Sequence, residues 1–185
     1  PPPVPCVLAF SPVGTGLIYW IAGSPWWHTI GSHEAKVVTD ASGYDYQPDW
    51  SHDGKHIIFT RYQKDALDLW QRDLQAGREI ALTSHGDVNV EPRYSPDDRR
   101  VAFVSTADSG HFNLYLTEVA DDHFGAIKRL IPEHTSKIYR YYYAPPDHVI
   151  NPSWTPDGQR PLFVSNREEA YGTGCLRAVA VTGPG

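Results

Sequence analysis

The segment Pro48–Phe59, PDWSHDGKHIIF, decides the fold of this 185-residue chain. Trp50 is the aromatic end of one expected strand, a tight turn phrase follows, and an apolar stretch begins at Ile57. In the turn, Asp53 can accept hydrogen bonds from the neighbouring backbone and Gly54 tolerates a positive φ, so the chain can reverse sharply. The segment therefore predicts two antiparallel β-strands joined by a tight turn.

The same phrase recurs three more times. Its aromatic residue stands at Phe10, Trp50, Tyr94 and Trp154, and an apolar strand follows the turn each time. The spacings between these aromatic residues are 40, 44 and 60 residues, and a four-stranded propeller blade has about 40–45 residues. No segment shows a sustained helical period. We therefore predict an all-β fold, a β-propeller of four recognisable four-stranded antiparallel blades, either alone or as part of a larger ring.

The repeat gives the expected domain organisation. We expect a single domain over residues 1–185, or a fragment of a propeller, with blades at about 7–40, 44–84, 88–131 and 149–181 and an insertion at 132–148. The last blade has no recognisable fourth strand before the chain ends. Each aromatic residue of the phrase is expected to face the core, and Phe59, Trp70 and Phe103 should lie buried between blades, because they alternate with polar neighbours.

Composition excludes several classes of function. The net charge is −6 and no cluster of Lys and Arg occurs, whereas nucleic-acid binding requires a basic face. No run of 18 apolar residues is present to span a membrane. The start, Pro1–Pro5, has neither the basic nor the apolar region of a signal peptide. Because the chain has no Met at all, we expect it to be a processed or excised piece of something longer.

The sequence indicates no catalytic centre, no metal site and no cofactor. It has nine His residues, but a turn separates His52 from His56 and no three or four ligands converge in the pattern. No Gly-x-Ser-x-Gly elbow of a serine hydrolase is present. Aspartates recur with the repeat, which indicates a role in the turns. These aspartates are Asp53, Asp97 and Asp157.

The two cysteines leave their pairing open. Cys6 and Cys175 lie at opposite ends of the chain. A ring fold brings its ends together, so a disulfide is geometrically feasible. Two unpaired thiols, with Cys175 as a small apolar residue of a strand, are the alternative.

The insertion at 132–148 is the best candidate for a binding site. Long loops on rigid scaffolds often carry function, and tyrosines offer a large contact area together with a hydroxyl. We predict that the insertion forms the rim of a site for a protein, peptide or carbohydrate. The alternative is a loop that only covers a blade edge. The predicted site residues are Tyr139, Arg140, Tyr141, Tyr142, Tyr143, Asp147 and His148.

The repeated phrase resembles the TolB-type, WD40-like repeat, which runs Pro-x-Trp-Ser-Pro-Asp-Gly-Lys-x-Ile-x-Phe. Segment Pro48–Phe59 carries the resemblance, Leu82-Thr83 matches the usual end of a fourth strand, and the likeness extends over about residues 7–181. Three positions depart from the pattern. His52 replaces the usual Pro, Val13 replaces Asp in the first copy, and Asp98 replaces Gly in the third.

The resemblance implies the fold more strongly than it implies a function. Some members are stand-alone periplasmic scaffolds that bind proteins, and others are propellers fused to prolyl-oligopeptidase-like peptidases or to metal-dependent amidohydrolases. The stretches 139–154 and 166–168 are similar to propellers of the amidohydrolase group. On this basis we expect a bacterial, non-catalytic binding module that is periplasmic or secreted. The alternative is a propeller segment of a larger hydrolase, fused to or associated with a catalytic domain outside this chain.

Overall fold

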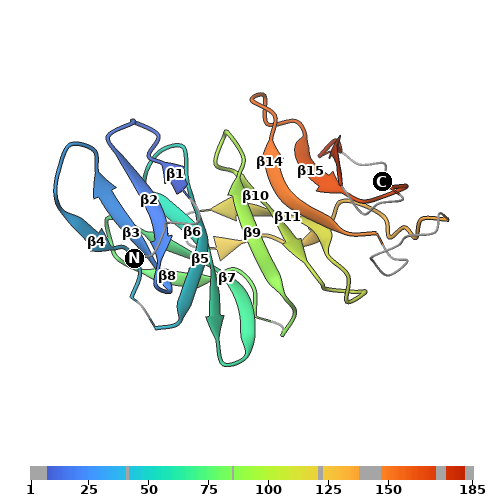
Figure 1. The fold of residues 1–185 in the computed structure, drawn as a ribbon, viewed down its shortest axis with the longest axis horizontal. Helices are drawn as coiled ribbons and strands as arrows, with labels where there is room; N and C mark the ends of the chain where they lie inside the picture. Colours follow the sequence, from blue (N-terminus) through green and yellow to red (C-terminus); the bar gives the residue numbers. More distant parts are fainter. Residues whose placement is uncertain are drawn as a thin grey trace.

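The computed structural model describes residues 8–40, 42–84, 86–120, 123–137, 147–169 and 174–181. These residues form four antiparallel sheets that stand side by side in chain order, from blade 1 at the N-terminal end to blade 4 at the C-terminal end (Figure 1). The described part contains no helix long and apolar enough to cross a membrane. The all-β prediction is therefore confirmed.

In each blade consecutive strands pair, except that β13 of blade 3 pairs with β11. Blade 1 consists of β1 (Leu8–Phe10), β2 (Gly16–Ile21), β3 (Ser24–Thr29) and β4 (Ala35–Val37). Blade 2 consists of β5 (Tyr44–Trp50), β6 (His56–Gln63), β7 (Ala66–Asp73) and β8 (Glu79–Ala81). Blade 3 consists of β9 (Asn89–Tyr94), β10 (Arg100–Ser105), β11 (Asn113–Ala120), β12 (His123–Phe124) and β13 (Lys128–Arg129). Blade 4 consists of β14 (Val149–Trp154), β15 (Pro161–Ser165) and β16 (Cys175–Ala178).

The turn phrase has the conformation that its residues predict. Ser51 Oγ donates to Asp53 Oδ1 at 2.7 Å and accepts the N–H of His56 at 2.9 Å, so the hydroxyl closes the turn. Gly54 has a φ of +74°, which a residue without Cβ adopts at little cost. Blades 3 and 4 repeat the hydroxyl-to-Asp bond with Ser95 and Thr155. The recurring aspartates are therefore turn residues, as expected.

The first strands of blades 2, 3 and 4 carry an irregularity that the sequence did not reveal. Gln47, Glu91 and Asn151 each precede a proline and have φ values of +48°, +57° and +53°. The pairing register shifts at each of these positions. Gln47 Oε1 accepts the N–H of Glu91 at 3.1 Å, and Glu91 Oε2 accepts the N–H of Asn151 at 2.5 Å. The three bulges thus link neighbouring blades through their side chains.

The core lies between the blades. Phe59 and Phe103 are fully buried, as predicted, whereas Trp70 is only half-buried. The guanidinium of Arg61 lies 4.9 Å from the Trp70 ring centroid and supplies part of its packing. Phe10 contradicts the expectation that each aromatic residue of the phrase faces a core, because it is 65% exposed. Phe10 lies on the outer blade, where no described blade covers it.

Candidate binding site

Most of the predicted site residues cannot be placed. Tyr139, Arg140, Tyr141, Tyr142 and Tyr143 lie outside the described residues, so their role as a binding rim stays a prediction. The structure describes Asp147 and His148, which directly precede β14.

Asp147 anchors the base of the insertion. Its carboxylate accepts a hydrogen bond from Ser136 Oγ at 2.6 Å and contacts Nδ1 of His134, and its N–H donates to the carbonyl of His134 at 3.2 Å. Ser136 Oγ also accepts the N–H of Glu168 at 2.7 Å. The Asp147 side chain is only 7% exposed. It therefore ties the described ends of the insertion to the loop after β15.

His148 lies at the junction of blades 3 and 4. Its N–H donates to Asn166 Oδ1 at 2.8 Å. Its ring stands edge-on to His111, with the ring centroids 5.7 Å apart, and lies 6.0 Å from the Phe112 centroid. His148 is half-buried in these contacts, so aromatic packing fixes its position.

Cys175 is exposed on β16, contrary to the expectation of a small apolar strand residue. Its Sγ donates to Glu169 Oε1 at 2.9 Å, and this hydrogen bond raises the pKa of the thiol. The proposed disulfide partner Cys6 lies outside the described residues, so the bridge stays untested.

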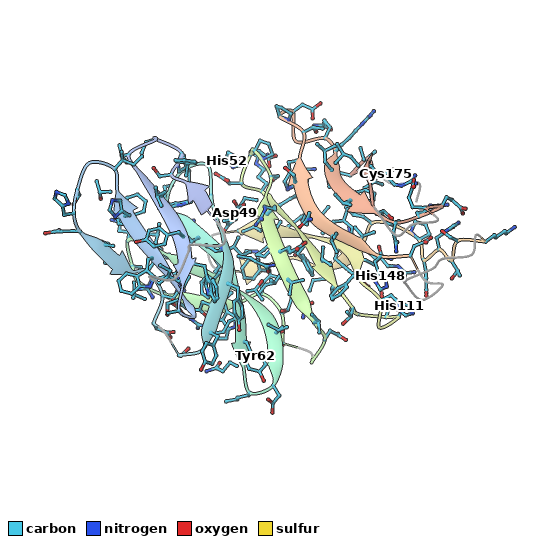
Figure 2. All side chains as sticks on the ribbon, viewed as in Figure 1. Asp49, His52, Tyr62, His111, His148 and Cys175 are labelled. Carbon is cyan, nitrogen blue, oxygen red and sulfur yellow. The ribbon has the colours of Figure 1, made fainter. Side chains whose placement is uncertain are left out.

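An aromatic cleft opens where blades 1, 2 and 3 meet. It lies where β5 begins, β6 ends and β9 begins, and the insertion enters β14 at the corresponding end of blade 4. Figure 2 shows Tyr62, His111 and His148 toward this same edge of the molecule. The cleft has a volume of about 490 Å³. Its lining residues are Trp20, Tyr46, Gln47, Thr60, Tyr62, Leu67 and Val90.

The cleft combines an apolar wall with a few polar groups. The Trp20 and Tyr46 rings lie 5.7 Å apart between centroids. The buried Nε1 of Trp20 has no hydrogen-bond partner among the described residues, and a buried indole N–H usually has one. Thr60 Oγ1 donates to Gln47 Oε1 at 3.2 Å. The aromatic rings that line the cleft suit a largely apolar ligand.

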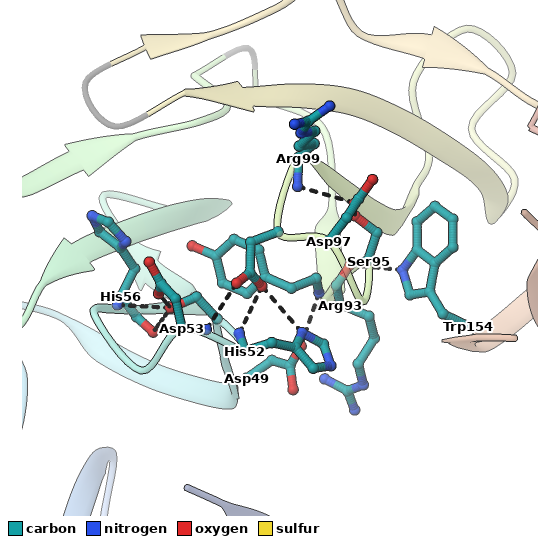
Figure 3. A network of polar contacts seen from close by, with 12 residues as sticks. Asp49, His52, Asp53, His56, Arg93, Ser95, Asp97, Arg99 and Trp154 are labelled. Carbon is teal, nitrogen blue, oxygen red and sulfur yellow. Dashed lines mark hydrogen bonds and ion pairs between the residues drawn. The ribbon is translucent and has the colours of Figure 1, made fainter. Parts of the chain in front are cut away.

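A polar network occupies the opposite end of the first strands (Figure 3). Asp98 accepts the N–H groups of His52 and Asp53 at 2.6 and 2.8 Å. Asp49 Oδ2 accepts the N–H of Tyr94 at 2.9 Å. Burial raises the pKa of Asp49, and the charge of Arg93 opposes that rise. These hydrogen bonds link the turns and first strands of blades 2 and 3.

The described residues hold no metal centre. Within the ranges that the structure describes, no group of three or more His, Cys, Asp or Glu side chains could hold a metal ion. The nucleophile candidates are equally poor, because Cys175 is exposed with a raised pKa.

The aromatic cleft was missed by sequence reasoning. Its clearest signal is Trp20, because the paired strands place it at the position of Thr60 in blade 2 and Val104 in blade 3. A tryptophan where the other blades have smaller residues indicates that the surface of blade 1 differs from theirs at this position. Tyr44 and Tyr62, which face each other in the β5–β6 register, are a second signal.

The stacked antiparallel sheets of three to five strands and their repeated turn phrase define a β-propeller repeat protein. The TolB beta propeller domain family matches residues 47–172. The chain therefore belongs to the TolB β-propeller domain family.

Similar proteins agree with this assignment. The Tol-Pal system protein TolB of Francisella tularensis subsp. holarctica is 25% identical over 107 residues, which cover 51% of this chain and 24% of that relative. The crystal structure of TolB from Acinetobacter baumannii matches with a TM-score of 0.72 and 18% identity, over 96% of this chain and 44% of that one. Prolyl oligopeptidase B from Galerina marginata matches with a TM-score of 0.66 and 13% identity, over 96% of this chain and 26% of that one. The match thus spans less than half of each of these proteins, and the two structural likenesses concern the fold alone.

Proposed function

We propose that this chain is a non-catalytic binding module that holds an extended, largely apolar peptide segment of a partner protein in the aromatic cleft. The observation that carries the proposal is the cleft itself, where Trp20, Tyr46 and Tyr62 from two blades line one open apolar surface of about 490 Å³. In protein recognition, a small number of aromatic side chains that become buried commonly supplies most of the binding energy. The insertion with its four tyrosines stays the predicted rim of the site.

The family supports a protein as the partner. The relatives at 25% identity carry the description of Tol-Pal system proteins, and we extend from them a role in an assembly of proteins and a periplasmic location. A protein segment also fits the chemistry, because apolar side chains can contact the aromatic rings of the cleft. A carbohydrate, the other partner class that we predicted, has no further support.

The alternative, a propeller segment of a larger hydrolase, rests on likeness of fold. Prolyl oligopeptidase B shares 13% identity with this chain. A likeness of fold at this identity does not imply a shared activity. The described residues contain no group that favours a hydrolytic role over binding.

A selected peptide tests the proposal. Random peptides displayed on phage would be selected on the full chain, and the tightest one measured by the change in tryptophan fluorescence. Val90→Trp should fill the cleft and weaken binding by about tenfold or more. The matched control Val13→Trp changes a turn residue that is 77% exposed and should leave affinity unchanged. Equal affinities for the two variants, or no selected peptide at all, would overturn the proposal.

A further inference from the structure

A second hollow, here called the outer cavity, lies between blades 2 and 3, each of which stands between two described blades (Figure 1). It has a volume of about 570 Å³ and opens between β8 of blade 2 and the outer strands β12 and β13 of blade 3. No described residue lines both this cavity and the aromatic cleft. The residues that matter below are Ile80, Asp87, Asn89, Asp108, Phe124 and Ile127, all of which line it.

One end of the outer cavity presents oxygen acceptors. Asp87 and Asp108 line this end, and neither forms an ion pair with a cation among the described residues. Asn89 is only 4% exposed, and its Nδ2 donates to the carbonyl of Asp87 at 3.3 Å and to Asp68 Oδ1 at 3.4 Å. The Oδ1 of Asn89 has no hydrogen-bond partner in the described part of the chain, which is unusual for a buried amide. This end therefore suits a ligand that brings several hydrogen-bond donors.

The charges around Tyr115 indicate that the same end is negative. The Tyr115 hydroxyl donates to Asp108 Oδ2 at 3.1 Å. Burial, this hydrogen bond and the charges of Asp108 and Asp87 raise the pKa of Tyr115 to about 12, although the charge of Arg129 opposes the rise. Arg129 also lines the cavity, but it is exposed and forms no ion pair with either carboxylate among the described residues. Because two carboxylates face one guanidinium and the chain has a net charge of −6, a cationic ligand is favoured.

The rest of the outer cavity offers apolar and backbone contacts. Phe124 is half-buried and Ile127 is 40% exposed, so both present apolar surface beside the acceptors. The aliphatic stem of a long cationic side chain packs on such surface while its charged head reaches polar groups. Within the described residues, β8 pairs only with β7 and β13 only with β11. The outer edges of both strands are therefore open to the backbone of an extended segment.

We infer that the outer cavity binds an arginine side chain of a partner protein, carried on an extended segment that lies along β8. The guanidinium donates to Asp87, Asp108 and Asn89. The stem packs against Phe124 and Ile127. Arginine fits better than lysine, because its planar head has five donors for several separate acceptors and stacks on aromatic rings. This inference does not rest on the proposed function of the aromatic cleft.

A titration followed by NMR tests the inference. The probe is the tripeptide acetyl-Val-Arg-Val-amide, added to the full chain labelled with ¹⁵N. Saturable shifts are expected at the backbone amides of Asn89, Asp108 and Gly125, which line the cavity. The same peptide with citrulline in place of arginine keeps the shape and loses the charge, so it should bind about tenfold more weakly.

Asp108→Asn separates recognition of the charge from general contact. It should weaken binding of the arginine peptide by about tenfold and leave binding of the citrulline peptide nearly unchanged. The matched control is Asp65→Asn. Asp65 also has a positive φ, +62° against +70° for Asp108, and also accepts a tyrosine hydroxyl, but it does not line the cavity. Asparagine tolerates such a φ, so both variants should keep the melting curve of the wild type.

Several results would overturn the inference. They are equal affinities for the arginine and citrulline peptides, shifts confined to amides outside the cavity, the absence of any saturable shift, and equal losses of affinity in Asp108→Asn and Asp65→Asn. Each of these outcomes leaves the aromatic cleft untested, since the cleft is lined by other residues.

Discussion

The backbone N–H of His52 donates a 2.6 Å hydrogen bond to Oδ1 of Asp98 in the turn of the next blade. Both residues depart from the family phrase, which has Pro and Gly at these positions. A proline at 52 would have no N–H to donate, and a glycine at 98 would have no carboxylate to accept. Asp98 adopts a φ of +58°, where glycine is favoured. The two departures therefore compensate each other across the interface of blades 2 and 3.

A double-mutant cycle tests this relationship. His52→Pro and Asp98→Gly should each destabilise the chain, because each removes the bond while its partner remains. The double variant restores the family phrase at both positions. Its free energy of unfolding should fall by less than the sum of the two single losses, with a coupling energy of about 0.5–3 kcal/mol. Urea unfolding would measure the four free energies. Additive effects would show that the bond contributes nothing to stability.

Replacement of Arg61 should be among the most destabilising changes in blade 2. Arg61 is 1% exposed and donates to Asp45 at 2.6 Å and to Glu79 at 2.8 Å. Asp45 is 0% exposed, so Arg61→Met would leave its carboxylate buried without a partner and should cost about 3–5 kcal/mol. The control Lys55→Met removes an exposed pair with Asp53 and should change the free energy of unfolding by less than about 0.5 kcal/mol. A loss below about 1 kcal/mol for Arg61→Met would contradict the interpretation of this cluster.

Asp49→Asn should change how stability depends on pH. Burial raises the pKa of Asp49 above its ordinary value of 3.8, so the folded chain holds this proton more tightly than the unfolded chain does. The contribution of Asp49 to the free energy of unfolding therefore falls as the pH rises from 3.8 through the raised pKa. Relative to wild type, Asp49→Asn should gain stability over that interval and keep the gain at neutral pH. Urea unfolding between about pH 3 and pH 7, a range that begins below the ordinary pKa of an aspartate, would measure the difference.

Asp157→Asn provides the opposite case. Hydrogen bonds from Thr155 and from the N–H of Gln159 lower the pKa of Asp157. Its stabilising contribution is therefore present above the ordinary pKa and is lost as pH falls through the lowered pKa. Asp157→Asn should be less stable than wild type at neutral pH, and the difference should vanish in acid. The same sign of pH dependence in both variants would refute this assignment of the two carboxylates.

Replacement of two tyrosines tests the insertion. The double change Tyr141→Ser and Tyr142→Ser should alter the free energy of unfolding by less than about 0.5 kcal/mol, while weakening the binding of the selected peptide. The reason is that a binding rim contributes contact area to the ligand and little to the core. Chemical unfolding and fluorescence titration would be compared on the same variant. Loss of folding would instead assign these tyrosines to the core.

The sequence predicted the parts of the fold that depend on local chemistry. The turns formed where Ser51, Asp53 and Gly54 supply a hydroxyl, a carboxylate and a permissive φ, and the strands followed from the apolar alternation. The bulge at Gln47 escaped prediction, because it depends on pairing between strands and on the next blade. The exposure of Phe10 escaped too, since it depends on which blade stands in front.

The aromatic cleft is a property of three blades together. Trp20, Tyr46 and Val90 are far apart in the sequence and meet only when the blades stack. By contrast, the insertion interrupts the repeat spacing and is visible in the sequence alone. The sequence therefore indicated the insertion, which interrupts the repeat, as a candidate site. It did not indicate the aromatic cleft, which forms only where neighbouring blades pack together.

Photocrosslinking from Tyr62 tests the central claim most directly. Tyr62 lines the aromatic cleft and is 38% exposed, so benzoylphenylalanine at this position should fit and should face a bound ligand. With the selected peptide and the full chain, we predict a covalent peptide adduct from position 62 and none from the same group at Val13. Adducts of equal yield at both positions, or an adduct at Val13 alone, would contradict the assignment of the cleft as the binding site.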